Sequence, residues 1–253
     1  MGKLEAKRAL VTGGGQGLGY AITARLLEAG ADVAVHYFSS EAGARELKCL
    51  AETRGRRAEI FRADLTNPGD AAALVDDAAR FLGGLDILVN NAGDLVERRT
   101  LEEVDVDFWQ RVMNVNLTSM LLVTQAATPW LAKTGQASIV NLSSLAGRKG
   151  GHPGSLVYST SKGGVLTWTR ALATELASRG IRVNAVAPGL ILGTRFHATH
   201  TSAASAQASV KQIPLGRAGT PDDVARAVVV LASEYDGFIT GATLDINGGV
   251  YAA

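Results

Sequence analysis

Short apolar runs alternate with longer amphipathic segments along the whole chain. Most of the apolar runs are β-branched or aliphatic with little strict alternation, which is typical of strands covered on both faces. Seven such runs predict strands at Arg8–Thr12, Asp32–His36, Ala58–Arg62, Ile87–Asn90, Ala137–Leu142, Ile181–Val186 and Ala242–Ile246.

Helical patterns lie between these runs, near 17–29, 40–53, 68–82, 105–132, 155–178 and 221–233. Pro68 and Pro221 stand where a first helical turn tolerates proline, and acidic residues follow each of them. Strands that alternate with helices through short links predict an α/β fold: a doubly wound parallel sheet of about seven strands with helices on both faces. No repeat, low-complexity tract or linker divides the chain, so we expect one domain over residues 1–253.

One long stretch, about 189–214, shows no such pattern and is rich in Ala, Ser, Thr and Gly. Compact domains seldom carry about 20 structureless residues unless these form a lid or a binding loop. Ligands of such sheets bind beyond the carboxyl ends of the strands, so we expect this stretch to be a mobile substrate loop. A short surface helix is the alternative.

Composition narrows the class of protein. The 253 residues carry 25 Lys and Arg against 24 Asp and Glu, a balance that excludes a strongly basic nucleic-acid-binding protein. No apolar run approaches the roughly 18–20 residues that would span a bilayer, so no membrane partner is expected. The amino-terminal segment lacks the apolar core of a signal peptide, and Cys49 is the single cysteine. A cytoplasmic location is therefore expected.

The first predicted strand leads into the glycine-rich turn Thr12–Gly19 and then into a helical pattern. Glycine lets the backbone approach a ligand closely, and the helix that follows offers free N–H groups and a positive dipole end to a pyrophosphate. The spacing differs from the six-residue G-x-G-x-x-G pattern, and tight packing alone can produce such turns. Candidate cofactor contacts in the turn are Gly13, Gly15, Gln16, Gly17, Leu18 and Gly19.

The end of the second predicted strand bears on which dinucleotide would bind. A carboxylate there would pair with a ribose 2′-OH and favour NAD, but residues 35–40 contain neither a carboxylate nor an arginine. Ser39 and Ser40, after Tyr37, could hold a phosphate, which gives a slight preference for NADP(H) over NAD(H). Each serine could instead cap a helix. Asp64 and Leu65, after the third strand, could meet an adenine edge or simply form a turn.

Tyr158 and Lys162 stand four residues apart, hence on one face of a predicted helix. Such a pair arises easily by chance. Its value comes from its place downstream of a strand that ends in Asn141-Leu142-Ser143-Ser144, in a chain that begins with the glycine turn.

With these motifs in order, the sequence resembles the short-chain dehydrogenase/reductase family in its compact form of about 250 residues. The resemblance covers essentially the whole chain through Thr12-Gly13, Gly17-Leu18-Gly19, Asp64-Leu65, Asn90-Asn91-Ala92-Gly93, Asn116, Ser144, Tyr158, Lys162 and Pro188-Gly189. It implies a Rossmann-type domain, a nicotinamide cofactor, hydride transfer at a ketone or secondary alcohol, and a homotetramer or dimer.

The resemblance also implies roles for individual residues. Tyr158 would act as general acid/base, with a pKa lowered by Lys162, which would also bond the nicotinamide ribose. Ser144 would donate a hydrogen bond to the substrate oxygen, and Asn116, with Asn114 as a competitor, would hold a water that links Lys162 to solvent. The remaining cofactor contacts would be Asn91, Ala92, Gly93, Pro188, Gly189 and Thr194.

The substrate is not determined by these motifs, and a 3-oxoacyl-thioester reductase and a sugar or polyol dehydrogenase are both open. A non-catalytic dinucleotide sensor of the same fold is the alternative from another class, but such a protein would not need Tyr158 and Lys162. The four histidines show no metal-ligand spacing, so no metal is expected.

Overall fold

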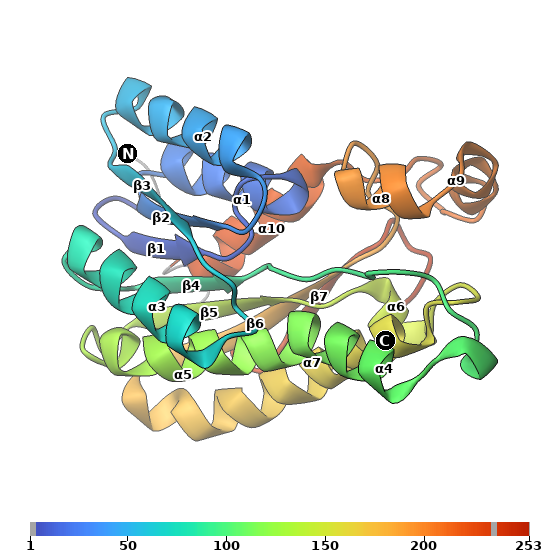
Figure 1. Cartoon of the computed structure of the whole chain (residues 1–253). Helices are drawn as coiled ribbons and strands as arrows, with labels where there is room; N and C mark the ends of the chain where they lie inside the picture. Colours follow the sequence, from blue (N-terminus) through green and yellow to red (C-terminus); the bar gives the residue numbers. More distant parts are fainter. Residues whose placement is uncertain (1–3, 234–236, 253) are drawn as a thin grey trace.

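Seven strands form one sheet in which every pair of neighbours is parallel, in the order β3-β2-β1-β4-β5-β6-β7 (Figure 1). The computed structural model describes residues 4–233 and 237–252. The strands are β1 (Arg8–Val11), β2 (Asp32–Tyr37), β3 (Ala58–Arg62), β4 (Ile87–Asn90), β5 (Ala137–Leu142), β6 (Ile181–Pro188) and β7 (Thr243–Ile246). The predicted α/β fold and its seven strands are confirmed.

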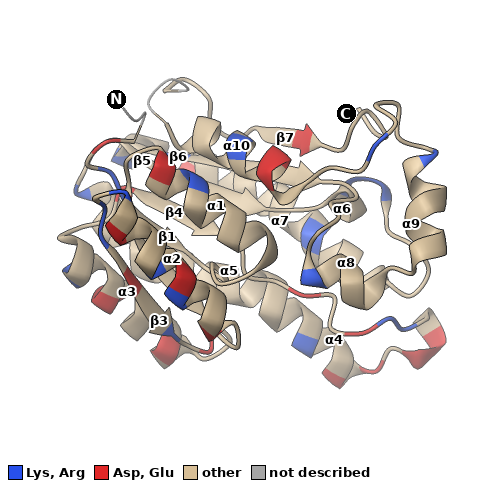
Figure 2. Ribbon diagram, turned by 90° about the horizontal axis from the view of Figure 1, so that it is seen from above, with Lys and Arg blue, Asp and Glu red and all other residues tan. Residues whose placement is uncertain are grey.

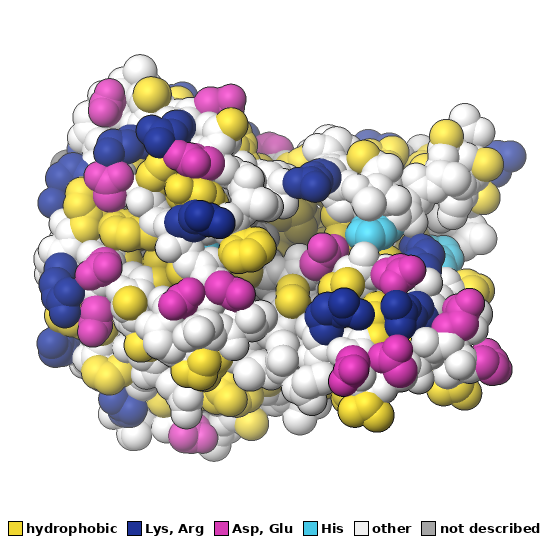
Figure 3. Space-filling view, in the orientation of Figure 1, with side chains coloured by type: hydrophobic (Ala, Val, Ile, Leu, Met, Phe, Trp, Pro, Cys, Tyr) yellow, Lys and Arg dark blue, Asp and Glu magenta, His cyan; other side chains and the backbone are white. Residues whose placement is uncertain are grey.

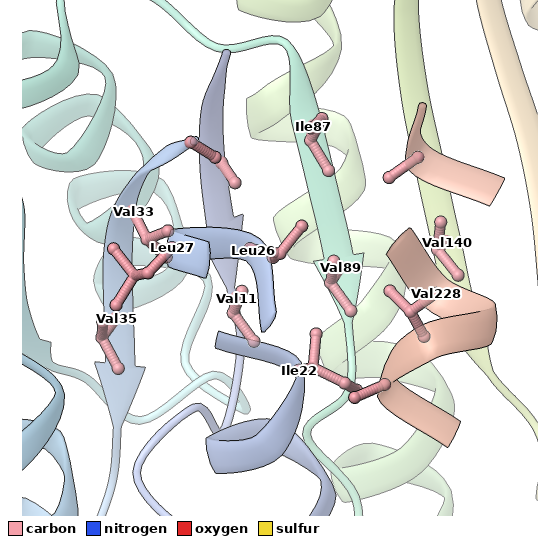
Figure 4. Close-up of a cluster of buried hydrophobic side chains, with 14 of the residues drawn as sticks. Val11, Ile22, Leu26, Leu27, Val33, Val35, Ile87, Val89, Val140 and Val228 are labelled. Atoms are coloured by element: carbon pink, nitrogen blue, oxygen red, sulfur yellow. The ribbon is translucent and has the colours of Figure 1, made fainter. Parts of the chain in front are cut away.

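Helices cover both faces of the sheet (Figure 1). One face carries α1 (Gly17–Glu28), α2 (Glu41–Thr53) and α10 (Pro221–Ala232), and the other carries α3 (Pro68–Leu82), α5 (Ser119–Ala132) and α7 (Leu156–Leu176). Successive strand residues alternate between the two apolar layers: Val11 and Val89 pack toward α1 and α10, whereas Leu10 and Leu88 pack toward α3 and α5. Figure 4 shows the first layer, in which Ile22 and Leu26 of α1 meet strand valines. This alternation explains the continuous apolar runs in the sequence.

The helix predicted at 105–132 is not one regular helix. It consists of α4 (Val106–Met113), a π-helical turn at Asn114–Thr118 and then α5. A π turn holds one extra residue and is invisible to a 3.6-residue pattern. Asn114 and Val115 of this turn line the cavity described below, and Asn116 is completely buried.

The stretch 189–214 was predicted to be irregular, and that was wrong over much of its length. It contains α8 (Arg195–His200) and α9 (Ala203–Val210), which project beyond the carboxyl edge of the sheet (Figures 1 and 2). Thr194 and Ser202 cap these helices, because their hydroxyl oxygens accept from the backbone N–H groups of His197 and Ser205. Another short helix, α6 (Leu145–Lys149), follows β5.

The two edges of the sheet differ in their connections. At the amino edge α2, α3 and α5 lead into turns that contain Gly55, Gly83 and Gly135, where an added side chain would meet nothing within 4 Å. At the carboxyl edge the connections pack against one another and form the site described below. Among the residues that the structure describes, no helix is both long enough and apolar enough to cross a membrane.

Candidate active site

A cavity of about 1130 Å³ lies at the carboxyl edge of the sheet. Its lining comes from the segments that follow β1 to β6 and from the segment that contains α8. In Figure 3 the surface is hollowed between the body of the sheet and the projecting α8–α9 segment. Both the shape and the position suit a ligand that crosses several strand ends.

The glycine turn forms one end of the cavity. Gly13 and Gly17 have positive φ angles of 62° and 54°, and a Cβ on Gly19 would lie 2.1 Å from the carbonyl oxygen of Gly13. Gln16, the residue before α1, makes no side-chain cap, so the first N–H groups of this 12-residue helix are left to a ligand. These features fit the pyrophosphate of a dinucleotide.

His36 holds this turn in place, a role that the sequence did not reveal. Its Nδ1 accepts from the backbone N–H of Gly13 at 2.9 Å, and its Nε2 lies 3.1 Å from the carbonyl oxygen of Ala63 after β3. Burial lowers the pKa of His36 to about 4, so the ring is neutral and its Nδ1 remains an acceptor. The imidazole therefore ties the turn after β1 to the end of β3.

Most of the predicted contacts at the ends of β2 and β3 line the cavity. Ser39, Ser40, Asp64 and Leu65 are among the lining residues. Hydrogen bonds from the hydroxyl and the backbone N–H of Thr66 lower the pKa of Asp64.

Two predicted cofactor residues do not line the cavity. The Tyr37 side chain packs in the apolar layer against α1 and α2, because strand residues alternate in direction and its neighbours His36 and Phe38 point toward the cavity instead. Gly15 faces the backbone of Ser40, whose carbonyl oxygen would lie 2.3 Å from an added Cβ. Gly15 thus allows the approach of two turns.

The segment after β4 connects the glycine turn to the centre of the cavity. The Asn91 amide donates to the carbonyl oxygens of Thr12 and Gly13 at 2.8 and 3.0 Å, while the Thr12 hydroxyl accepts from the N–H groups of Asn91 and Ala92. Asn91, Ala92 and Gly93, which the sequence predicts as cofactor contacts, all line the cavity.

Tyr158, Lys162 and Ser144 meet at the centre of the cavity. Ser144, which follows β5, lines the cavity with Tyr158, and its hydroxyl lowers the pKa of the phenol. The Lys162 Nζ lies 5.8 Å from the centre of the Tyr158 ring. Lys162 also donates to the carbonyl oxygen of Leu142 at 2.8 Å. The helix face predicted from the sequence thus brings the pair together with the serine.

The pKa of Tyr158 does not move in the expected direction in the chain alone. Burial raises it to about 12, against the lowering effect of the bond with Ser144, and the charge of Asp94 raises it further. Burial also lowers the pKa of Lys162 to about 8. Desolvation thus dominates both groups, because each charged form loses water in the protein interior.

Asn116 lies behind the cavity lining. Its amide donates to the carbonyl oxygens of Asp94 at 2.6 Å and Val112 at 2.9 Å, and its Oδ1 accepts from the N–H of Asp94 at 3.1 Å. A Cβ on Gly93 would lie 2.6 Å from the Asn116 Oδ1 and 3.0 Å from the Lys162 Nζ, so both groups border the same small space. The competitor, Asn114, lines the cavity and accepts from Gln110.

The remaining predicted contacts, Pro188, Gly189 and Thr194, also line the cavity. Thr194 faces the glycine turn, since its Cβ would be 3.7 Å from a Cβ on Gly17. Beyond Thr194, the Phe196 ring of α8 packs against the Tyr158 ring with 5.7 Å between their centres. Nothing in the residue pattern signals Phe196, because it lies in an unpatterned stretch, 38 residues from the tyrosine that it contacts.

The sheet and its cavity define an α/β protein with a dinucleotide site. A family model described as enoyl-(acyl carrier protein) reductase matches residues 13–251. An uncharacterized oxidoreductase of Methylorubrum extorquens is 41% identical over 99% of this chain and 100% of its own length. The 3-oxoacyl-[acyl-carrier-protein] reductase of Staphylococcus aureus is 37% identical over 97% of this chain and 98% of its own length.

Solved structures agree with these relatives. A short chain dehydrogenase from Burkholderia cenocepacia in complex with NADP matches with a TM-score of 0.91 and 36% identity, over 99% of this chain and 100% of that one. An NADH-dependent reductase responsible for alginate metabolism matches with a TM-score of 0.89 and 34% identity, over 99% of each chain.

The chain belongs to the short-chain dehydrogenase/reductase family. It is an NAD(P)-dependent oxidoreductase that acts on a CH–OH group or a carbonyl of a small-molecule substrate. Both the predicted family and the predicted class of reaction are confirmed.

Proposed function

We propose that the protein interconverts a ketone and a secondary alcohol with Tyr158, Ser144, Lys162 and Asn116 as its catalytic set. The observation that carries the proposal is that Tyr158 and Ser144 converge on the cavity wall, with the Lys162 Nζ 5.8 Å from the centre of the phenol ring. A carbonyl oxygen placed between the two hydroxyls would accept from both of them.

Each residue has a distinct task in this proposal. A bound NAD(P)H supplies the hydride. Tyr158 donates the proton to the oxygen of the substrate, and with its pKa near 12 it is fully protonated at neutral pH, as ketone reduction requires. Ser144 holds the substrate oxygen, and Lys162 stabilises the phenolate that Tyr158 leaves behind.

Asn116 has a positioning task. Two of its three hydrogen bonds fix the backbone of Asp94 beside Gly93, and the third is made to the carbonyl oxygen of Val112. Its Oδ1 faces the space next to the Lys162 Nζ. We propose that a water in this space connects Lys162 with solvent and returns the proton to Tyr158.

The test is Tyr158→Phe, which removes the proton donor and keeps the ring. Turnover should fall by about 10²- to 10⁴-fold. NADPH should bind as before, because the glycine turn is untouched. Tyr20→Phe, on α1 and outside the cavity lining, is the matched control and should keep wild-type turnover. A Tyr158→Phe enzyme with unchanged turnover on a substrate found in a panel of ketones, sugars and acyl thioesters would refute the assignment.

We also propose that NADP(H) is preferred over NAD(H). Ser39 and Ser40 line the cavity, the end of β2 carries no carboxylate, and Ser40 precedes α2 without a side-chain cap, so N–H groups there are left to a phosphate. Fluorescence titration should give a lower Kd for NADPH than for NADH, and the reverse order would contradict the preference.

We further propose that the chain forms one catalytic domain and that it works in the cytoplasm. We propose that residues 1–253 form a single domain in which 189–214 covers the substrate, since α8 packs on Tyr158. The single cysteine, Cys49, allows no intrachain disulfide and suits a reducing compartment. A homotetramer or dimer is proposed from the family, and light scattering would measure it.

A further inference from the structure

Basic side chains from three separate segments gather at the substrate end of the cavity. Arg98 comes from the segment between β4 and α4, His152 from the turn after α6, and His197 from α8, and all three line the cavity. Figure 3 shows histidine and Lys or Arg side chains close together beneath α8. Nothing in the catalytic proposal uses them.

Arg98 carries a charge that no carboxylate compensates within the described ranges. Its Nε and Nη2 donate to the carbonyl oxygen of His200 at 3.3 and 3.1 Å, and its Nη1 donates to that of Pro153 at 3.2 Å. The next residue, Arg99, lies outside the cavity lining and is paired with Glu97 and Asp105 at 3.1 and 3.2 Å. Of these two neighbouring arginines, the one that lines the cavity, Arg98, is therefore the one without a carboxylate partner.

The pKa of His197 is affected by these neighbouring basic groups. Burial lowers its pKa to about 4, and the charges of His200, Arg98 and His152 lower it further. Its Nδ1 is bonded to the Thr201 hydroxyl at 2.9 Å. A carboxylate borders this group as well: Asp94 is exposed and lies 3.4 Å from the Nε2 of His200.

The other charged residues that line this end of the cavity are also mainly positive. Lys149 and Arg195 also face the cavity, and Arg111 and Asp107 of α4 add one charge of each sign. The positive charge therefore exceeds the negative charge at this end. An anion placed here would relieve mutual repulsion as well as gain hydrogen bonds.

The basic cluster Arg98–His152–His197 is close to the reacting group. The Phe196 ring lies 5.7 Å from the ring of Tyr158 and 5.2 Å from that of His197, centre to centre. One aromatic ring thus lies between the proton donor and His197, and Arg98 and His152 are close enough to His197 to lower its pKa. We therefore expect a small substrate to reach both Tyr158 and the cluster.

We propose that the natural substrate is a carbonyl compound with an anionic group, a carboxylate or a phosphate, which the cluster Arg98–His152–His197 binds while the carbonyl lies at Tyr158. The proposal rests on the function proposed above and adds a substrate class to it. A glycosyl or acyl substrate without charge near its carbonyl would leave the cluster unused.

The experiment compares charged and neutral members of matched pairs in NADPH-dependent reduction. The pairs are 3-oxobutanoate with ethyl 3-oxobutanoate, 2-oxobutanoate with its methyl ester, and dihydroxyacetone phosphate with dihydroxyacetone. The charged member of at least one pair should have a kcat/KM about tenfold or more above its neutral partner, and the pair that shows the difference distinguishes a carboxylate from a phosphate.

Arg98→Gln should lower kcat/KM for the charged member by about 10- to 100-fold, mainly through KM, and change the neutral member by less than about threefold. Arg98→Lys should recover part of the loss because it keeps the charge, and Arg99→Gln should behave as wild type toward both members. The NADPH Kd should be the same in all four proteins.

Three results would overturn the proposal. The neutral members could react as well as the charged ones in every pair, or Arg98→Gln could lower kcat/KM equally for both members of a pair. Arg98→Gln could also lower NADPH affinity, which would assign Arg98 to a cofactor phosphate.

If no pair reacts, succinate is titrated against the NADPH complex with succinamide as control. Binding of succinate that Arg98→Gln abolishes supports the proposal, and no binding refutes it. Tyr158→Phe should keep this binding, which separates the anion site from the proposed catalysis.

Discussion

The two ends of the cavity are constructed in different ways. The end at the glycine turn consists of backbone and small residues, and an added methyl at Gly19 or Gly15 would collide with a carbonyl oxygen. The substrate end consists of long polar side chains on short segments, where Arg98 joins α8 to the turn after α6 through carbonyl oxygens alone. A phosphate site needs a rigid backbone, whereas a substrate site is adapted through side chains on loops. The two ends of the cavity differ in this way.

One histidine at each end shows the same difference between a fixed scaffold and a substrate site. His36 and His197 both have a pKa of about 4, with burial as the largest cause. At His36 both ring nitrogens lie within hydrogen-bonding distance of backbone atoms, so the ring is part of the scaffold. At His197 the neighbouring basic side chains of Arg98, His152 and His200 add to the effect, which makes the ring sensitive to an anion that binds beside it.

Gly19→Ala should have the largest effect, because it disturbs the backbone of the glycine turn and leaves the substrate end of the cavity unchanged. The new Cβ would lie 2.1 Å from the Gly13 carbonyl oxygen, which cannot move without shifting the whole turn. We expect a loss of about 2–3 kcal/mol in the free energy of unfolding and roughly 100-fold weaker NADPH binding. Urea denaturation and fluorescence titration measure the two.

Gly163→Ala is the control for this substitution. Gly163 lies inside α7, and an added Cβ there would meet its nearest neighbour, the Gly147 carbonyl oxygen, at an ordinary 3.5 Å. It should be neutral or stabilising by about 0.5–1 kcal/mol. Equal losses for the two variants would show that the turn is no more constrained than a helix.

Lys162→Met tests the point where the two ends meet. The pKa of Lys162 is about 8 in the folded protein and near 10.5 when unfolded, so between these values only the unfolded chain holds the proton. Raising the pH from 8 to 10 should therefore stabilise the wild type by about 2 kcal/mol more than Lys162→Met. Urea denaturation at several pH values measures the difference, and parallel curves for the two proteins would contradict the burial of a chargeable amine.

His36→Asn should have the smallest of these effects and compares the ends directly. The folded pKa of His36 is about 4 and the unfolded value near 6.5, so the unfolded chain takes up the proton first as the pH falls. From pH 6.5 to 5 the wild type should lose between about 1 and 2 kcal/mol of stability that His36→Asn retains. His197→Asn should retain a similar amount, because the pKa of His197 is also about 4. Urea denaturation at several pH values measures both variants, and curves parallel to that of the wild type would contradict a buried neutral ring at these positions.

The sequence predicted the sheet and the glycine-turn end well, because both depend on local patterns. Apolar runs locate strands, and a glycine before a helix signals a close approach wherever it occurs. The Tyr158–Lys162 pair followed from helical spacing in the same way. Tyr37 and Gly15 are the exceptions at this end. The alternation of a strand points Tyr37 into the core, and Gly15 faces the backbone of Ser40; a choice by position in the sequence alone missed both.

The substrate end was not predictable from the sequence, for physical reasons. The partners of Arg98 are backbone carbonyls, one of them 102 residues away, and a carbonyl leaves no trace in the residue types. α8 and α9 have no apolar stripe, because they cover a cavity instead of a core. The π turn at Asn114–Thr118 adds one residue without changing composition.

The amino edge of the sheet carries a practical consequence for engineering. Gly55, Gly83 and Gly135 lie in turns with free space around them, on the side remote from the reaction. A purification tag, a fluorescent reporter or the new termini of a circular permutant could be introduced there. The enzyme could thus be immobilised or linked to a second catalyst through this edge with its pocket facing outward.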